Sequence, residues 1–151
     1  MLRMKVRAPT ARQVRFVLCE DARQEVSGKA TLVGVYPGEI IVVHQPTSPE
    51  GSNAVAALRS VCMVFFVAGG VGRFDAGIKV CAPDGTVSFE QKVGTIVLES
   101  GGTGTIIGQI QPFFVKEFGA HTVVLTLEGR EYPFEMTIRK AVPAAIPATI
   151  N

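Results

Sequence analysis

Apolar and polar residues alternate with a period of two along most of the chain. The clearest example is the segment 132–139, where every second side chain is apolar. This spacing places one face of a β-strand on a core and the other face in water. Residues 121–127 repeat the pattern, and the segment 128–131 between the two runs contains a glycine. The two runs therefore predict an antiparallel hairpin.

A second hairpin is indicated upstream. Residues 74–82 also alternate, and the sequence Pro-Asp-Gly follows at 83–85. Proline presets φ and glycine tolerates a positive φ, so this is a turn sequence. Alternate apolar residues between 87 and 93 continue on the far side. The run 61–68 differs because it is apolar on both faces. We expect a central strand covered on both sides, or one whose outer face meets a partner.

The remaining patterns complete an all-β prediction. Further strands are expected at 14–19, 30–36, 40–43, and as a pair at 95–99 and 104–111 around a glycine-rich turn. Only residues 53–60 suggest a helical turn. Eight or nine short strands, with turn signals about every ten residues, predict an antiparallel β-sandwich, immunoglobulin-like or related. A closed β-barrel is the alternative.

Composition narrows the class of protein. The chain has 151 residues, of which 47% are apolar and 19% charged, and a formal net charge of +2. It is too apolar for a disordered protein, has no 18-residue apolar run for a membrane helix, and its three cysteines do not make a disulfide scaffold. We expect one sandwich domain over 13–140, a basic N-terminal arm over 1–12, and a Pro/Ala-rich tail over 141–151.

The basic arm is the main charge feature. Residues 1–15 carry five cations and no acid, which leaves a net charge of −3 for the rest of the chain. The arm is a candidate nucleic-acid contact, because exposed cations release counterions from phosphate; its candidate residues are Arg3, Lys5, Arg7 and Arg12. A merely solubilising terminus is the alternative, since no aromatic residue lies between the cations. No apolar stretch of a secretory signal follows, so we expect a cytoplasmic protein with free thiols.

An acidic connection between the first two expected strands is the candidate metal site. It contains Glu20, Asp21 and Glu25 within six residues. Three carboxylates can hold a hard cation such as calcium. They can equally form surface ion pairs with Arg23 and Lys29, which are common and weak. The spacing matches no EF-hand loop, and we expect no resident metal or cofactor.

Other candidate chemistry is sparse. The glycine-rich segments 101–108 and 69–72 lack the following helix that a phosphate loop requires, so we expect hairpin loops. His44 and His121 are too few for a zinc site and are expected as half-exposed residues at strand ends. Cys19 precedes two carboxylates, which would raise its thiol pKa and make it a poor nucleophile. No catalytic residue is predicted.

One segment resembles a known family. Residues 19–36 read Cys-Glu-Asp-Ala-Arg-Gln-Glu-Val-Ser-Gly-Lys-Ala-Thr-Leu-Val-Gly-Val-Tyr. This resembles the opening of a family of uncharacterised bacterial and phage proteins, in which a strand leads through an acidic Gly-Lys connection into a Gly-Val-Tyr strand. The turn at 127–130, with Gly119 before its hairpin, is similar to that family's end. The resemblance covers residues 13–140 and implies a small β-sandwich of unknown function.

Three functions follow from these patterns. The first is a non-enzymatic structural or protein-interaction module that self-associates, most simply as a twofold dimer, or binds another protein. The resemblance extends this to a phage or prophage origin. The second is a nucleic-acid-binding protein that uses the basic arm. The third is a metal or small-ligand binder, or an enzyme, with a site in the loops at Glu20–Lys29 or Gly101–Gly104. No membrane partner is expected.

Overall fold

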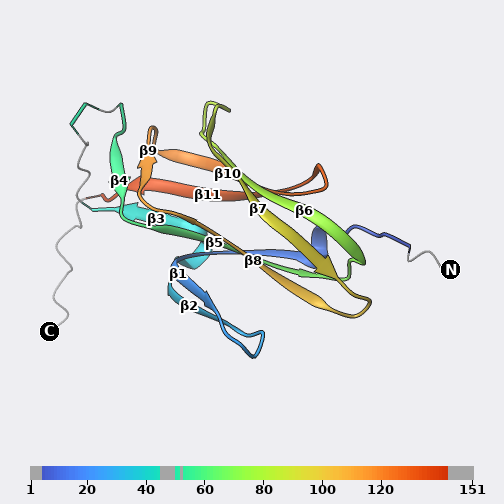
Figure 1. Ribbon diagram of the computed structural model, residues 1–151. Coiled ribbons are helices and arrows are strands. Elements are labelled where there is room, and N and C mark those ends of the chain that lie inside the picture. The colour runs from blue at the N-terminus through green and yellow to red at the C-terminus, as the bar shows by residue number, and fades with distance from the viewer. Residues whose placement is uncertain (1–4, 45–49, 52, 143–151) are drawn as a thin grey trace, which may run out of the picture.

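The computed structural model of the chain describes residues 5–44, 50–51 and 53–142. Within them lie eleven strands and two short 3₁₀ turns, η1 (Ala11–Gln13) and η2 (Pro37–Glu39) (Figure 1). The strands are β1 (Val14–Gln24), β2 (Ala30–Val35), β3 (Ile40–Val43), β4 (Ala56–Leu58), β5 (Val61–Ala68), β6 (Gly72–Cys81), β7 (Val87–Leu98), β8 (Thr103–Ile110), β9 (Phe113–Val115), β10 (Gly119–Leu127) and β11 (Arg130–Lys140).

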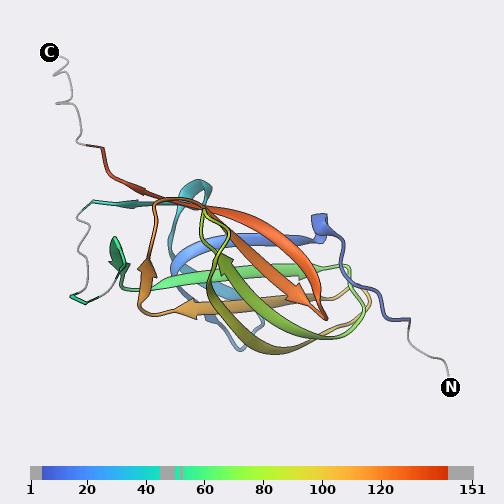
Figure 2. The same ribbon diagram turned by 90° about the horizontal axis from the view of Figure 1, so that it is seen from above.

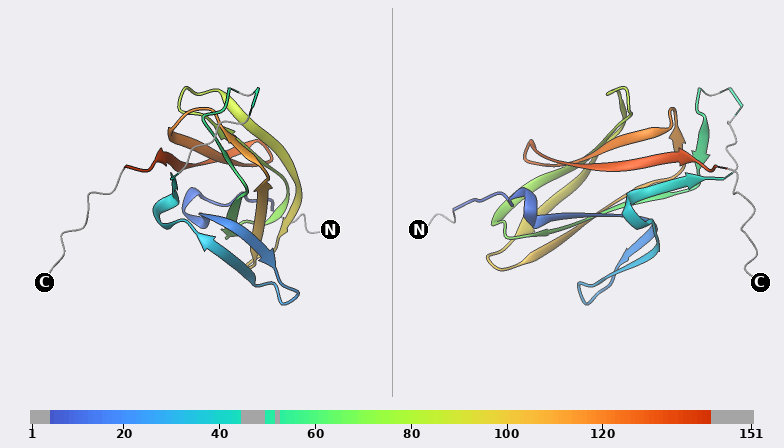
Figure 3. Two further views of the ribbon diagram at one scale, coloured as in Figure 1. Left: turned by 90° about the vertical axis from the view of Figure 1, so that its left-hand side faces the viewer. Right: turned by 180° about the vertical axis from the view of Figure 1, so that it is seen from behind.

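In this described part, the strands form two stacked sheets and a small ribbon. One sheet has the order β2-β1-β5-β8, the other β3-β11-β10-β6-β7, and β4 pairs with β9. All of these pairings are antiparallel except that of β3 with β11. The two layers are seen edge-on in Figure 3. The predicted all-β sandwich is therefore confirmed.

The core fills the space between the two sheets. Alternate residues of β6, β10 and β11 point inward and are buried, as the period of two predicts. Phe65 of β5 is fully buried, and its ring lies 5.2 Å from that of Phe16 and 5.9 Å from that of Phe134. Aromatic rings at such separations add to the stabilisation from buried apolar area. This cluster joins β1 and β5 of one sheet to β11 of the other.

Both predicted hairpins form. β10 and β11 pair from Gly119 with Ile138 to Leu127 with Arg130, and β6 and β7 flank the turn at 83–85. The sequence predicted two strands within 87–98, but the segment forms the single strand β7. Two register shifts in its pairing with β6 let the strand continue where the apolar and polar residues stop alternating.

Two local predictions are wrong. Residues 95–99 and 104–111 do not form a hairpin, since β7 pairs with β6 and β8 pairs with β5 in the other sheet. The glycine-rich turn carries the chain from one layer to the other. The expected helical turn within 53–60 is strand β4, which pairs with β9. A helical turn would satisfy backbone groups locally, whereas this segment finds its partner more than fifty residues away.

β1 bends sharply and carries a hairpin back beneath the four-stranded sheet (Figure 1). Cys19 is its last residue paired with β5, opposite Cys62, and its first paired with β2, opposite Val35. At the bend, Gly34 has a φ of +66°, and the Glu20 side chain occupies the space that a Cβ would need. From here β1 and β2 run together as a separate arm.

The folded-back hairpin explains why β5 is apolar on both faces. Its outer face forms a second, smaller apolar cluster built on Cys19, Cys62 and Val64. Residues that pack against these three are Val17, Ala22, Leu32, Phe66 and Ile107. Because Ala22 and Leu32 belong to the hairpin arm, the chain covers much of its own outer sheet face. Of the two expectations for the run 61–68, coverage on both sides is therefore met from within the chain.

The two ends of the described chain lie at opposite ends of the sandwich (Figure 2). Arg7 exchanges two backbone hydrogen bonds of 2.8 Å with Val71, and the buried Pro9 accepts a 2.6 Å hydrogen bond from the Tyr132 hydroxyl. Residues 5–12 of the predicted arm thus lie along the domain. Arg3 and residues 143–151 of the predicted tail lie outside the described residues.

Candidate functional site

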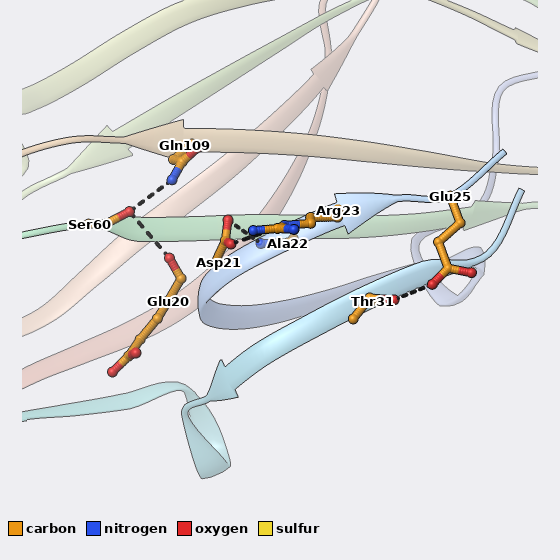
Figure 4. Close-up of polar contacts among 8 residues, drawn as sticks. All are labelled: Glu20, Asp21, Ala22, Arg23, Glu25, Thr31, Ser60 and Gln109. Atoms are coloured by element: carbon orange, nitrogen blue, oxygen red, sulfur yellow. Dashed lines mark hydrogen bonds and ion pairs between the residues drawn. The ribbon is translucent and has the colours of Figure 1, made fainter.

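The three carboxylates of the predicted metal site do not converge (Figure 4). The expected acidic loop is strand β1, in which successive side chains point to opposite faces. Asp21 accepts a 3.0 Å hydrogen bond from the Ala22 backbone N–H and lies 3.6 Å from Arg23 Nε. Glu25 lies one residue beyond the end of β1 and accepts a 2.6 Å hydrogen bond from Thr31 Oγ1.

These three carboxylates therefore do not form a metal-binding site. Among the described residues, no group of three His, Cys, Asp or Glu side chains is placed to hold a metal ion. The Glu20 side chain points away from Asp21, and the Glu20 carbonyl accepts a 3.2 Å hydrogen bond from Ser60. Of the two expected ion pairs, Arg23 forms one with Asp21, whereas no described carboxylate pairs with Lys29. The expectation that Glu20, Asp21 and Glu25 share one loop was wrong.

His121 is buried, contrary to the expectation of a half-exposed strand end. Only 2% of its surface is accessible, because it is the third residue of β10 and points into the domain. Its Nε2 lies 2.9 Å from the Glu117 carbonyl oxygen, which can only accept, so Nε2 carries the proton. Nδ1 is buried without a hydrogen-bond partner among the described residues. Burial lowers the pKa of His121 below its ordinary 6.5, although Glu117 opposes this. His44 lies just after β3, at a strand end as predicted, and is exposed rather than half-exposed.

Two of the three cysteines are buried thiols rather than nucleophiles. Cys19 and Cys62 are opposite each other on β1 and β5, and both are free. Burial is the main cause that raises the pKa of Cys19, and Asp21 adds to it. The sequence identified the carboxylate effect but missed the larger effect of burial. Burial and the neighbouring Cys19 raise the pKa of Cys62 to about 12. Thiolates, not thiols, react, so neither residue is poised for nucleophilic catalysis.

Both glycine-rich segments lead into strands, as predicted, but the expectation of hairpin loops was wrong, because each segment joins strands of different sheets. Residues 101–102 precede β8, and Gly69–Gly70 joins β5 to β6. Gly69 has a φ of +74°, and the side chain of Gln13 occupies the space beside its Cα. These glycines therefore permit close packing and tight turns, and no helix N-terminus follows them to bind phosphate.

A basic cleft lies between the hairpin arm and the outer face of the four-stranded sheet. It has a volume of about 600 Å³ and joins residues from η1, the turn of the β1–β2 hairpin, β5 and β8. Its polar side chains are Arg12, Gln13, Arg15, Lys29, Thr103 and Thr105, and its apolar side includes Phe66. Both segments that the sequence proposed as ligand sites contribute, through Gly28–Lys29 and Thr103–Gly104. The first was proposed for its carboxylates, but it contributes the cation Lys29 instead.

The cations of this cleft are uncompensated. Arg12, Arg15 and Lys29 are exposed, and none forms an ion pair with a described residue. No carboxylate belongs to the described lining. The sequence analysis named Arg12 as a candidate nucleic-acid contact. It counted Arg15 only in the net charge of residues 1–15, and it considered Lys29 only as an ion-pair partner of the acidic residues. No sequence signal places Lys29 near Arg12, because the fold-back of the hairpin brings them to one cleft.

A second hollow of about 680 Å³ lies over β6 and β7 on the outer face of the five-stranded sheet. Its charged lining carries both signs, from Asp75, Lys79, Glu90, Lys92 and Glu131. Lys79 Nζ lies 3.3 Å from Glu131 Oε1, so part of this charge is neutralised within the lining. The hollow therefore offers no strong preference for a ligand of one charge.

The four described edge strands of the two sheets, β2, β8, β3 and β7, differ in how they are protected. Neither β8 nor β3 carries a charged residue, but β8 has no large apolar side chain that is exposed, and the four-residue β3 has only Ile40, at 38%. β2 contains no charged residue, and within the described chain it has a hydrogen-bonded neighbour only in β1. Val33 and Val35 on it are 52% and 49% exposed. β7 carries Glu90 and Lys92, and two register shifts interrupt its pairing with β6. Charges and bulges are the usual protection of an edge against pairing with another chain, and β2 lacks both.

Comparison with known proteins finds structural neighbours of low sequence identity. No family model and no curated protein matches the chain. Among solved structures it is similar to part of the alkylpurine DNA glycosylase AlkC of Pseudomonas fluorescens bound to DNA containing an abasic site analogue (10% identity, TM-score 0.46, 84% of this chain and 30% of that chain). It is also similar to part of a β-glucosidase of Listeria innocua in complex with isofagomine (12% identity, TM-score 0.35, 83% and 16%). The chain thus spans less than a third of either protein.

No helix in the described ranges is both long and apolar enough to cross a membrane.

Proposed function

We propose that the protein is a non-enzymatic interaction module that pairs with a second copy of itself through the open edge of β2. The observation that carries this proposal is that, of the four described edge strands of the two sheets, only β2 combines the absence of charge with two exposed valines, whereas β7 is charged and bulged. An uncharged edge with exposed valines is a template for strand addition. The valines also supply apolar area that pairing would remove from water.

A second copy fits this edge because β2 is compatible with twofold symmetry. In an antiparallel pair centred on Val33, that residue faces its own equivalent, and Thr31 faces Val35. No like charges meet, since β2 has none. A twofold interface uses one patch on both copies, and it is the commonest symmetry of soluble oligomers. The partner is therefore argued from the strand's own sequence.

The proposal includes an immunoglobulin-like strand order. The order β1-β5-β8 corresponds to A-B-E of such sandwiches, and β11-β10-β6 corresponds to G-F-C. In this assignment the hairpin arm is an addition to a common scaffold, which suits an interaction element. A cytoplasmic location and a phage-related family remain predictions of the sequence.

Light scattering after size-exclusion chromatography tests the proposal. The wild-type chain is expected to elute as a dimer of twice its 16.1 kDa mass. Val33→Lys places a charge at the centre of the pairing edge and is expected to weaken dimerisation at least tenfold. The matched control is Val97→Lys on β7, where the valine is 58% exposed; this variant is expected to remain dimeric. A monomeric wild type, or a Val33→Lys dimer of undiminished affinity, refutes the β2 interface.

A further inference from the structure

We propose that the basic cleft beneath the hairpin binds single-stranded nucleic acid, with backbone phosphates on Arg12, Arg15 and Lys29 and a base on Phe66. This site is separate from the open edge of β2. The proposal does not depend on dimerisation, because the three cations and Phe66 of the cleft lie outside β2, which shares only Ala30 with the lining.

The charge of the cleft points to an anionic ligand. Its three cations come from η1, β1 and the hairpin turn, and they meet in one cavity without a described counter-charge. Like charges held together repel each other, so an anion that enters stabilises the arrangement. Thr103 and Thr105 add hydroxyl donors on the opposite wall. Phosphate oxygens accept from both kinds of group.

The positive surface extends beyond one phosphate group. Arg7 donates a 3.0 Å hydrogen bond to the Gly69 carbonyl, and Gly69 follows Ala68, which lines the cleft. Gln13 also lines the cleft and packs beside Gly69. Cationic side chains therefore extend from Arg7 toward Arg12 and the cleft. An extended row of cations fits a polymer of phosphates better than one small anion.

Phe66 supplies the aromatic surface that the basic N-terminal arm lacks. In the sheet register it lies between Arg15 on β1 and Thr105 on β8, so the three side chains form one row across the outer face. Phe66 is half-buried and belongs to the lining of the cleft. Cations that follow a backbone, together with an aromatic ring on which a base stacks, are the usual means of binding single strands.

A single strand is favoured over a duplex. A duplex keeps its bases stacked inside and offers no free base face to Phe66, whereas an unpaired strand exposes them. The cleft is also walled on one side by the hairpin turn and on the other by β8. The expected ligand is therefore a short single strand with little sequence preference, since every base presents a similar ring face.

The test is fluorescence anisotropy of the full chain with a labelled 12-nucleotide single strand of mixed sequence, measured over a series of salt concentrations. We expect saturable binding at 50 mM salt, weaker binding to the same sequence as a duplex, and a slope of log K against log salt near −2. About 0.7 of this slope comes from each phosphate contact on a single strand. Arg12→Gln/Arg15→Gln/Lys29→Gln is expected to remove most of the slope and weaken binding at least tenfold.

The matched control removes three exposed cations elsewhere, as Lys92→Gln/Lys116→Gln/Arg139→Gln. It lowers the net charge equally and is expected to bind within about threefold of wild type. Phe66→Leu keeps an apolar side chain in the second cluster but removes the ring, and is expected to weaken binding about tenfold with the salt slope unchanged. All replaced cations are exposed, so the two triple variants are expected to keep the wild-type circular dichroism and melting temperature.

Three results would overturn the proposal. The first is no saturable binding of the single strand at 50 mM salt. The second is equal weakening by the cleft and control triple variants, which would assign binding to net charge alone. The third is binding to vesicles that contain phosphatidylserine without binding to the oligonucleotide, which would assign the cleft to a lipid headgroup. Dimerisation measured on the same variants separates this test from that of the β2 edge.

Discussion

The buried imidazole of His121 makes the stability of the domain sensitive to mild acid. Nε2–H donates to the Glu117 carbonyl, and Nδ1 lies buried without a described partner. Protonation would place a positive charge and an unpaired donor inside the fold, which costs free energy. The pKa of His121 is therefore lower in the folded chain than its ordinary 6.5, chiefly through burial. We expect the domain to lose stability as the pH falls below 6.5.

The sign and size follow from proton linkage. Between the folded and unfolded pKa values, the unfolded chain binds more protons, so the free energy of unfolding rises with pH. His121 thus contributes its full stabilisation above pH 6.5, and this contribution is lost as the pH falls through the folded pKa. One proton gives a slope of at most about 1.4 kcal/mol per pH unit. From pH 6.5 to 4.5 the loss is below about 3 kcal/mol, a large share of a typical 5–15 kcal/mol.

The assay is urea unfolding at half-unit steps from pH 7.5 to 4.5, a range in which histidine titrates and carboxylates begin to titrate only at the lower end. His121→Gln retains an amide that can donate to the Glu117 carbonyl but does not titrate, so its stability is expected to be flat where that of the wild type declines. His44→Gln removes the exposed histidine and is the matched control, with an expected decline like that of the wild type. The chain has only these two histidines, so an NMR titration of His44→Gln reports His121 directly.

Two outcomes contradict this reasoning. One is an equal decline of stability in wild type and His121→Gln between pH 6.5 and 4.5. The other is a His121 resonance that titrates at or above 6.5 in the folded protein. Either result would mean that the imidazole is more hydrated, or better paired when charged, than its 2% exposure indicates.

Three further predictions concern thiol access and core packing. In the native protein, Cys81, which is partly exposed, is expected to react with iodoacetamide well before Cys19 and Cys62, whose burial raises their pKa; mass spectrometry after brief alkylation shows the order, and equal rates would contradict it. Gly108→Ala is expected to cost about 1–3 kcal/mol in urea unfolding, because the new Cβ would overlap Cδ1 of Ile78. Adding Ile78→Val removes that methyl group, so the double variant is expected to be more stable than the sum of the single changes; strict additivity would show that the two positions do not compete for space.

Local patterns in the sequence predicted those elements whose partners are close in the chain. The hairpins β10–β11 and β6–β7 follow from alternation with a period of two on either side of a turn, and both are present. Their side chains face the core on every second residue, which a strand imposes whatever its neighbours are. The same reasoning failed at 53–60 and at 95–111. There the backbone partner lies in a distant segment, and no local signal identifies it.

Candidate residues were predicted less well than strands. The cluster of Glu20, Asp21 and Glu25 is close in sequence, but an extended strand separates neighbours and turns their side chains to opposite faces. Arg12 and Lys29 show the reverse effect, because they are distant in sequence yet line one cleft. Proximity along a β-chain is therefore a poor guide to proximity in space.

By itself, the sequence determined the all-β class, the two principal hairpins and the uneven charge of the chain, since each depends on residues within one turn or strand. Only the tertiary structure decided the bend of β1 at Cys19, the fold-back of the hairpin over β5, and the meeting of cations with Phe66 on one surface. The physical reason is that sheet pairing satisfies backbone hydrogen bonds between segments far apart in the chain. The choice among possible partners depends on how all strands bury their apolar faces together.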